Sequence, residues 1–325
     1  MNPDTLRALL GQAALAPSVH NTQPARWRIE PEGVTLFEDT LRRLPAGDPS
    51  GRDAAMSLGA AAEGLRLAAS RAGLRAVEEE ADGEVASGPL RPVMRFRFEE
   101  GGAPDPLAEW LERRQSWRGA FLAPDLSAHD AAQALAGEDA RVLTGEGRLG
   151  EIARGLDEAS WRFMRDTGFR RELLSWMRLS PRHPGWHRDG LNAEAMAMGR
   201  LEALGARFVL GPGFGLLEKV GLAKPLLSER QKTAGATAVV LFHRPAGEDP
   251  FRSGKHFHRL WLRIEQAGFG AAVLAALADD PEAAARLGAD LPSGHRLVSA
   301  FRIGRRPPDA LSGRARLPLD EILIR

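Results

Sequence analysis

The sequence predicts an α+β protein built from two related halves. Helical and strand patterns are mixed in both halves of the 325-residue chain, without the regular strand–helix alternation of a parallel sheet. One stretch of the first half, at 65–76, also recurs at 260–271. At about 150 residues per domain the length fits two domains or one large one.

Each expected element has its own pattern. Apolar residues three or four positions apart predict helices, alternation predicts strands, and Pro or Gly marks the turns. In the first half this predicts a helix over 4–15, strands over 26–30 and 34–38, a helix over 52–72 and a strand over 92–98. In the second half it predicts a helix over 104–114, a strand over 142–144, a helix over 151–164, a strand over 238–242, a helix over 256–266 and a strand over 295–303.

The internal repeat aligns residues 65–76 with residues 260–271. Five of the twelve aligned positions are identical, and each copy is an amphipathic helix followed by Ala-Gly. Glycine at that point accepts the left-handed conformation that ends many helices. We therefore predict a fused duplication, an intrachain pseudo-dimer with halves at 1–105 and 106–325. A cleft between such halves is a favoured ligand site.

Composition excludes several kinds of chemistry. The chain has no Cys, which excludes disulfides, a thiolate nucleophile and cysteine-ligated metal centres, and no Tyr, which excludes a phenolic general acid. The 44 basic and 43 acidic residues nearly cancel, so no nucleic-acid partner is expected. No apolar run is long enough for a bilayer and the first residues lack a signal-peptide pattern, so we expect no membrane partner and a cytoplasmic protein.

Two tempting motifs are set aside. The glycine-rich run at 145–150 spells the dinucleotide fingerprint between a strand and a helix, but the second strand with its acidic residue is missing, so we interpret it as a turn. His183 and His187 have a metal-like spacing, but Pro184 prevents them from sharing a helix face. No metal site is predicted.

Two arginine clusters favour an anionic ligand. Arg114, Ser116 and Arg118 stand at alternate positions, so in an extended segment their side chains point the same way. Arg314 and Arg316 repeat the spacing near the C-terminus. Guanidinium groups give planar, multi-donor contacts to phosphate. The alternative is a pair of solvated basic turns in an arginine-rich chain.

The segment 16–24 is rigid and polar. Prolines lie near both ends, and the polar side chains between them include Ser18, Asn21 and Gln23. Such a loop can present amides and backbone N–H groups to a planar heterocycle. The alternative is a helix-ending turn that satisfies only its own backbone.

Taken together, these three segments resemble the nitroreductase family of FMN proteins, specifically its fused, two-copy Acg-type members. The run Asp48-Pro-Ser-Gly-Arg52 and the motif Asp189-Gly-Leu191 after Trp176 also look like that subfamily. The similarity is scattered over almost the whole chain. Ala25 departs from the family, which usually has Trp directly after Gln-Pro.

The resemblance implies an antiparallel or mixed sheet flanked by helices in each half, and one FMN between the halves. The phosphate and ribityl tail would be held by Arg114, Ser116, Arg118, Arg314 and Arg316. The flavin would be approached by Pro17, Ser18, Asn21 and Gln23. Ser228 and Lys232 are further candidates by position. No side chain needs to act as a nucleophile, so no catalytic residue is predicted.

The activity implied is that of an oxidoreductase. NAD(P)H would reduce the flavin, which would then reduce a small nitroaromatic or quinone-type acceptor in ping-pong order. An alternative is a non-catalytic FMN store whose flavin is covered by a lid at 180–224, with Phe208, Phe214 and Leu216–Leu217 as its apolar underside. A third possibility is a flavin-free binding domain. The chain itself is expected to be a monomer or a homodimer.

Overall fold

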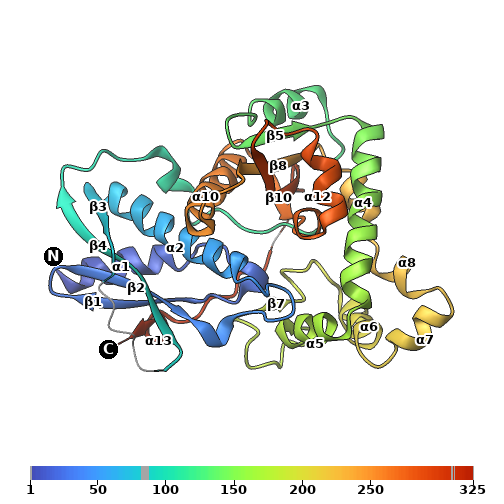
Figure 1. Ribbon diagram of the computed structural model, residues 1–325, viewed down its shortest axis with the longest axis horizontal. Helices are drawn as coiled ribbons and strands as arrows, with labels where there is room; N and C mark the ends of the chain where they lie inside the picture. The colour runs from blue at the N-terminus through green and yellow to red at the C-terminus, as the bar shows by residue number, and fades with distance from the viewer. Residues whose placement is uncertain (1, 82–87, 309, 311, 325) are drawn as a thin grey trace.

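Two main β-sheets are joined by two long helices, α2 (Arg52–Arg71) and α10 (Pro250–Gln266), which pack against each other (Figure 1). The computed structural model describes residues 2–81, 88–308, 310 and 312–324. The first sheet has the strand order β11-β1-β2-β4-β3 and the second has the order β5-β8-β10-β9. Helices flank both sheets, so the predicted α+β class is confirmed.

The strands of the first sheet are β1 (Ala25–Glu30), β2 (Gly33–Asp39), β3 (Leu74–Glu79), β4 (Leu90–Glu100) and β11 (Leu323–Ile324). Those of the second are β5 (Ala140–Leu143), β8 (Ala238–Pro245), β9 (Gly270–Val273) and β10 (His295–Gly304). Apart from β11, which is parallel to β1, neighbouring strands in both sheets are antiparallel.

The two halves share one topology. In the first, α2 (Arg52–Arg71) connects β2 to β3, and in the second, α10 (Pro250–Gln266) connects β8 to β9. The order β1-β2-β4-β3 therefore corresponds to β5-β8-β10-β9, with a long helix at the same point of each path. Gly73 and Gly268, which the sequence repeat aligns with each other, follow these helices with φ of 73° and 78°. The repeat seen in the sequence thus falls on equivalent elements.

The helices α2 and α10 cross in close contact at two glycines. A Cβ atom at Gly59 would lie 1.8 Å from the carbonyl oxygen of Phe251, and one at Gly254 would lie 2.1 Å from that of Met56. The register of the sequence repeat, continued back along both helices, aligns Gly59 with Gly254 and Met56 with Phe251. The contact is therefore reciprocal, as at the interface of a two-fold dimer.

The remaining helices cover the sheets and extend the second half. They are α1 (Pro3–Ala13), α3 (Leu126–Gln133), α4 (Glu146–Arg165), α5 (Thr167–Trp176), α6 (Arg200–Leu210), α7 (Phe214–Lys219), α8 (Ala223–Leu227), α9 (Arg230–Ala234), α11 (Ala276–Asp279), α12 (Pro281–Gly288) and α13 (Leu319–Ile322). Short 3₁₀ turns lie at Val19–Asn21, Thr40–Arg42 and Pro106–Trp110, and β6 (Met177–Arg178) pairs with β7 (Leu191–Asn192). Among the described residues, no helix has the length and apolar character required for crossing a bilayer.

Each half has its own apolar core, and the central helices share side chains between the cores. Trp27 and Phe96 are fully buried in the first core. In the second, Phe257 and Trp261 pack on Phe301 with ring centroids 5.0 and 5.2 Å away. Met56 of α2 belongs to the second core, whereas Leu262 of α10 belongs to the first. Burying one such side chain contributes about 1.5–3 kcal/mol, so the shared residues stabilise the junction.

Several sequence predictions differ from the structure. The helix expected over 104–114 is only the 3₁₀ turn Pro106–Trp110, after which the backbone turns so that the N–H of Arg114 donates to Trp110 O. Helix α10 begins at Pro250 rather than at the predicted residue 256, because Asp249 caps its first turn. Strands β3 and β9 were not predicted; each is short and closely follows a helix-ending glycine.

The glycine-rich run at 145–150 does not form a dinucleotide-binding unit. Only Gly145, with φ of 90°, lies in the turn, because α4 already begins at Glu146. Strand β5 before it is antiparallel to β8, whereas a dinucleotide-binding unit requires a parallel strand pair. The decision to set this motif aside is therefore confirmed by the topology.

Candidate binding cavity between the halves

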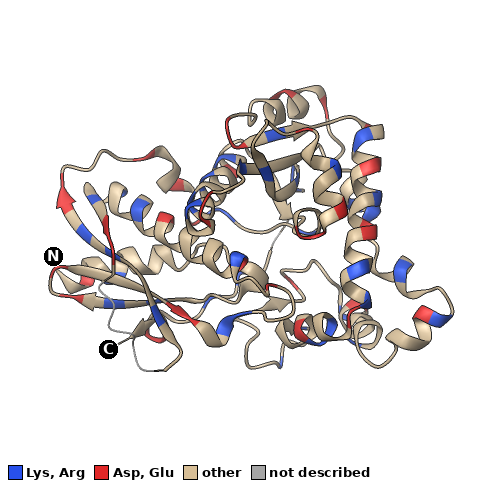
Figure 2. Cartoon of the chain, viewed as in Figure 1, with Lys and Arg blue, Asp and Glu red and all other residues tan. Residues whose placement is uncertain are grey.

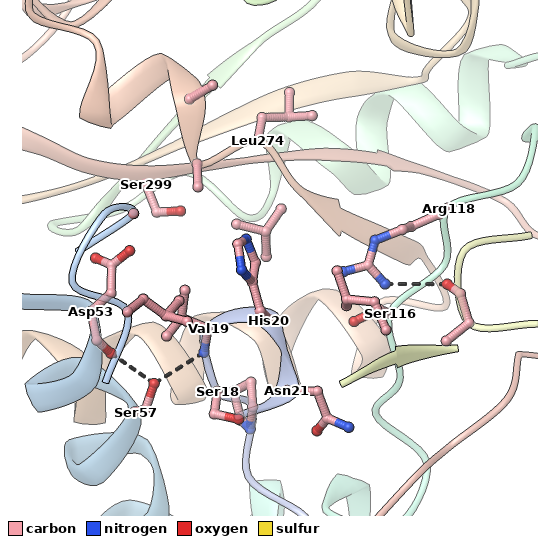
Figure 3. A pocket seen from close by; sticks show the side chains of 18 of the residues that line it. Ser18, Val19, His20, Asn21, Asp53, Ser57, Ser116, Arg118, Leu274 and Ser299 are labelled. Carbon is pink, nitrogen blue, oxygen red and sulfur yellow. Dashed lines mark hydrogen bonds between the residues drawn. The ribbon is translucent and has the colours of Figure 1, made fainter. Parts of the chain in front are cut away.

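A cavity of about 380 Å³ lies where the two halves meet. Its walls come from the loop at 17–21, the start of α2, the segment 114–118, the turn after β9 and the C-terminal segment 313–316. Figure 3 shows the labelled side chains around this space, with Arg118 and Ser116 at one side and Asp53 at the other. Residues far apart in the sequence therefore face one another here.

One end of the cavity is strongly cationic. Arg114, Arg314 and Arg316 lie close together there, whereas Arg118 lines the cavity nearer to Glu229, which is also a lining residue. None of the four arginines forms an ion pair with a carboxylate of the described residues. Arg114 is 2% exposed, and its Nε has no hydrogen-bond partner in the described chain. The nearby carboxylate Glu265 is bonded to Arg306 instead.

Burial and mutual repulsion make this charge costly. Burial, together with Arg316 and Arg314, lowers the pKa of Arg114 well below its ordinary value. Burial and then Arg314 lower the pKa of Arg316 to about 9. Buried charges are stable only when they are paired, so this end of the cavity favours a bound anion.

The segment 114–118 is extended, as its alternating polar residues predict. Ser116 forms an isolated parallel bridge with Ala271 of β9, and its carbonyl accepts a hydrogen bond from Ser312 Oγ at 2.7 Å. The Nη1 of Arg118 donates to Ala195 O at 3.2 Å (Figure 3). The fully buried Arg302 donates to Arg118 O and so holds the backbone of this segment in place.

The loop at 17–21 has a strained backbone. His20, Asn21 and Gln23 have φ of 45°, 56° and 53°, in the left-handed region that costs energy for residues other than glycine. Several hydrogen bonds hold it: Gln23 N donates to Ser18 Oγ at 2.9 Å, and Val19 N donates to Ser57 Oγ at 3.1 Å. Such strain persists only where the surroundings enforce it, and it is typical of ligand sites.

Asn21 joins three separate segments. Its Nδ2 donates to Gly190 O and to Ala315 O, both at 3.1 Å, and its Oδ1 accepts from Arg316 Nη1 at 3.0 Å. Because all these contacts are internal, its side chain orders the cavity wall. Pro17 and Ser18 also line the cavity.

Gln23 is bonded to Ser18 but is not among the residues that line the cavity. Its Nε2 donates to Arg188 O at 2.8 Å and its Oε1 accepts from Leu317 N at 2.9 Å. Ser228 and Lys232 also lie outside the lining: Ser228 bonds to Asp157, and Lys232 lies 3.7 Å from Glu229.

The segment expected as a lid is divided. Residues 190–191 and 195–196 line the cavity, whereas Phe208, Phe214 and Leu216–Leu217 are not among its lining residues. Phe214 instead stacks on Trp161 of α4, with ring centroids 5.8 Å apart. Phe208 is 51% exposed. Within the described chain, the apolar underside predicted from these side chains is therefore not part of this cavity.

The opposite end of the cavity has polar residues that sequence reasoning missed. They include Asp53 and Ser57 of α2, Asp279 of α11 and Ser299 of β10, while His20 of the strained loop lies between this end and Arg118 (Figure 3). Burial and then Arg118 lower the pKa of His20 to about 4, so its imidazole is neutral at pH 7. The motif at 48–52 was the one sequence signal near these residues. Among the described residues, no group of three or more possible ligands could hold a metal ion.

The curated relatives supply the deciding comparison. A segment of 73 residues is 42% identical to the putative NAD(P)H nitroreductase acg of Mycobacterium tuberculosis H37Rv, covering 22% of each chain. A segment of 58 residues is 45% identical to a second putative NAD(P)H nitroreductase of that strain, covering 18% of this chain and 17% of the relative. The chain is nitroreductase-like.

The nitroreductase-like relationship covers only about a fifth of each of these relatives. No family model matches the chain. A solved putative nitroreductase from Anabaena variabilis aligns over 94% of this chain and 90% of its own, at 10% identity and a TM-score of 0.48. The FMN-dependent nitroreductase NfnB from Mycobacterium smegmatis in complex with NADPH aligns over 63% of this chain and 90% of its own, at 18% identity and a TM-score of 0.35.

Proposed function

We propose that the chain binds one FMN in the cavity between its halves and acts as an NAD(P)H-dependent oxidoreductase on a small acceptor. The observation that carries the proposal is the set of four arginines that line the cavity, none of them ion-paired to a described carboxylate. A phosphate monoester would offset their mutual repulsion and the cost of their burial. The names of the curated relatives agree with this chemistry.

The residues present fit FMN. Its phosphate and ribityl tail would contact Arg114, Ser116, Arg118, Arg314 and Arg316, and its ring would lie toward Pro17, Ser18 and the wall that Asn21 orders. Bound FMN would take a hydride from reduced nicotinamide and pass electrons to a nitroaromatic or quinone, one substrate after the other. The chain's own contribution would be to bind, to orient and to exclude water.

We also propose that the chain is a fused duplication that acts as an intrachain pseudo-dimer, with halves at 1–105 and 106–325. The shared strand order, the reciprocal glycine contact and the paired Gly73 and Gly268 support it. The last strand, β11, returns to the first sheet, so the C-terminal segment ties the halves together. Both halves contribute to the cavity wall, which fits a single site per chain.

A second candidate function is storage of FMN without turnover. Leu191 and Met196, from the segment expected as a lid, line the cavity and would restrict access to a bound ring. An absorption spectrum of the purified protein, followed by anaerobic addition of NADPH and then NADH, separates the candidates. Flavin bands that bleach support the oxidoreductase, and bands that persist support storage. A protein that is colourless and takes up no added FMN would overturn both.

A further inference from the structure

Two carboxylates, one from each half, meet at the end of the cavity opposite the arginines. Asp53 lies in the first turn of α2, and Asp279 is the last residue of α11. Arg52 Nη2 donates to Asp53 Oδ1 at 3.1 Å and also to Asp279 Oδ1. Both acids line the cavity. A single guanidinium nitrogen therefore holds two carboxylates, and the Oδ2 atom of each accepts no hydrogen bond from the described chain.

The charges around this pair favour a retained proton. Asp48 is a third carboxylate nearby, and its Oδ2 accepts from Ala54 N at 2.9 Å. Arg52 is the cation that contacts the pair. Arg296 of β10 is a second cation nearby, and burial and then the charge of Arg52 lower its pKa. Burial and then the charge of Asp53 raise the pKa of Asp279 to about 6, and burial also raises the pKa of Asp53. Below about pH 6 the pair therefore retains a proton.

An unpartnered hydroxyl beside the pair points to a ligand. Ser299 is 5% exposed, lines the cavity, and its side chain forms no hydrogen bond with the described residues. Figure 3 shows it on the same side of the cavity as Asp53, away from Arg118. Its hydroxyl faces the cavity and has no partner within the described chain, so it can contact a bound molecule. This end of the cavity therefore combines a proton source with a free polar contact.

We propose that the Asp53–Asp279 pair is the proton donor to the electron acceptor in this cavity. The inference rests on the proposed oxidoreductase function. Reduction of a quinone to its hydroquinone requires one hydride, whose two electrons come from NAD(P)H by way of the flavin, and one proton. The proton on Asp279 Oδ2 passes to the acceptor oxygen, leaving Asp279 as a carboxylate, and water then returns a proton to the pair.

Half-reactions separate this role from flavin binding. Rapid-mixing measurements give the rate of flavin reduction by NADPH and, separately, the rate of flavin reoxidation by a quinone. In the wild type the reoxidation rate is expected to fall as the pH rises above about 6, as the pair loses its proton. Asp279→Asn is expected to slow reoxidation about 100-fold, within the usual effect of a general acid, and to abolish that pH dependence. Reduction by NADPH and flavin content are expected to stay unchanged.

Two further variants give the test its specificity. Asp53→Asn removes the neighbouring negative charge, so the pH dependence is expected to move to lower pH rather than vanish. Asp290→Asn, which loses a contact to Arg148 outside the cavity, is the control and is expected to match the wild type. Reoxidation with unchanged rate and pH profile in Asp279→Asn would overturn the inference while leaving the FMN function intact.

A readout without turnover tests the shared proton directly. Carbon-13 NMR of the apoprotein labelled at aspartate carboxyl groups is expected to show one signal that titrates near pH 6 and is missing in Asp279→Asn. Titration of every aspartate below pH 5 would contradict the proposal, whether or not the protein binds FMN. Failure of the wild type to bind FMN, in contrast, would count against the proposed function.

Discussion

At the scale of single residues, the alternating arginines were the most informative sequence signal. An extended backbone places Arg114, Ser116 and Arg118 on one side, and all three line the cavity. Sequence could not show that Arg114 is buried or that neither arginine has an ion pair, because both depend on which groups the fold brings near. Sequence also carried no signal for Asp279, which reaches the cavity through the packing of α11 against α4, α12 and β10.

Arg118→Ala is the clearest test of the anion site. Within the described chain its side chain forms one hydrogen bond, to Ala195 O, whereas Arg316 also holds the carbonyls of Ala14 and Leu15. Loss of a buried charge-assisted contact is expected to weaken FMN binding by about 2–5 kcal/mol. Titration of apoprotein with FMN, followed by flavin fluorescence, measures the change. Arg113→Ala, an exposed neighbour outside the cavity lining, is expected to bind like the wild type. Equal affinity in both variants would refute the assignment.

At the scale of elements, sequence periodicity predicted the long helices and most of the strands, because their burial patterns are regular. It did not predict the strained turn at 19–21, whose conformation depends on partners from distant parts of the chain, such as Gly190 and Ala315. Nor did it predict how α2 and α10 cross. The glycines at that crossing are visible in the sequence, but their partners are set by the tertiary fold.

The close crossing of α2 and α10 predicts that alanine at either crossing glycine lowers the free energy of unfolding strongly. In Gly59→Ala and Gly254→Ala the new methyl group would lie 1.8 and 2.1 Å from a backbone carbonyl oxygen, which is a severe steric clash. Overpacking usually costs about 1–3 kcal/mol. We expect each substitution to lower the free energy of unfolding by at least about 3 kcal/mol, because the backbone must move. Urea denaturation measures the change. Gly155→Ala is the control: it lies in α4 with open space around its Cβ and is expected to stabilise by about 0.5–1 kcal/mol. Tolerance of alanine at both crossing sites would contradict this packing.

Asn21 tests the strained loop. Asn21→Ala removes three hydrogen bonds and places alanine at a φ of 56°, so we expect a loss of about 2–4 kcal/mol in unfolding free energy. Asn21→Gly also loses the hydrogen bonds but tolerates this φ. The difference between the two variants, measured by thermal denaturation, is therefore expected to be about 1–2 kcal/mol in favour of glycine. Identical stabilities would show that this backbone position is not strained.

At the scale of the whole molecule, the site exists only because both halves and the C-terminal segment meet. Figure 2 shows basic and acidic residues scattered over both halves, in keeping with the balanced net charge of +1. The anion site is therefore not visible in overall charge and arises from a few arginines that are buried or partly buried. The internal repeat predicted two related halves. Only the fold shows that each central helix places a side chain in the core of the other half.

This arrangement predicts that the flavin phosphate stabilises the entire chain. A ligand that binds only the folded state adds about 2.7 kcal/mol of stability when its free concentration is 100 times its Kd. FMN in the cavity would bridge both halves. FMN is therefore expected to raise the melting temperature of the apoprotein in one cooperative transition. Riboflavin, which has the same ring but no phosphate, is expected to raise it far less, because the arginines then remain without an anion. In Arg118→Ala the advantage of FMN over riboflavin is expected to shrink. Equal shifts with both ligands in the wild type would mean that the arginines do not bind the phosphate, and two separate transitions would mean that the cavity does not couple the halves.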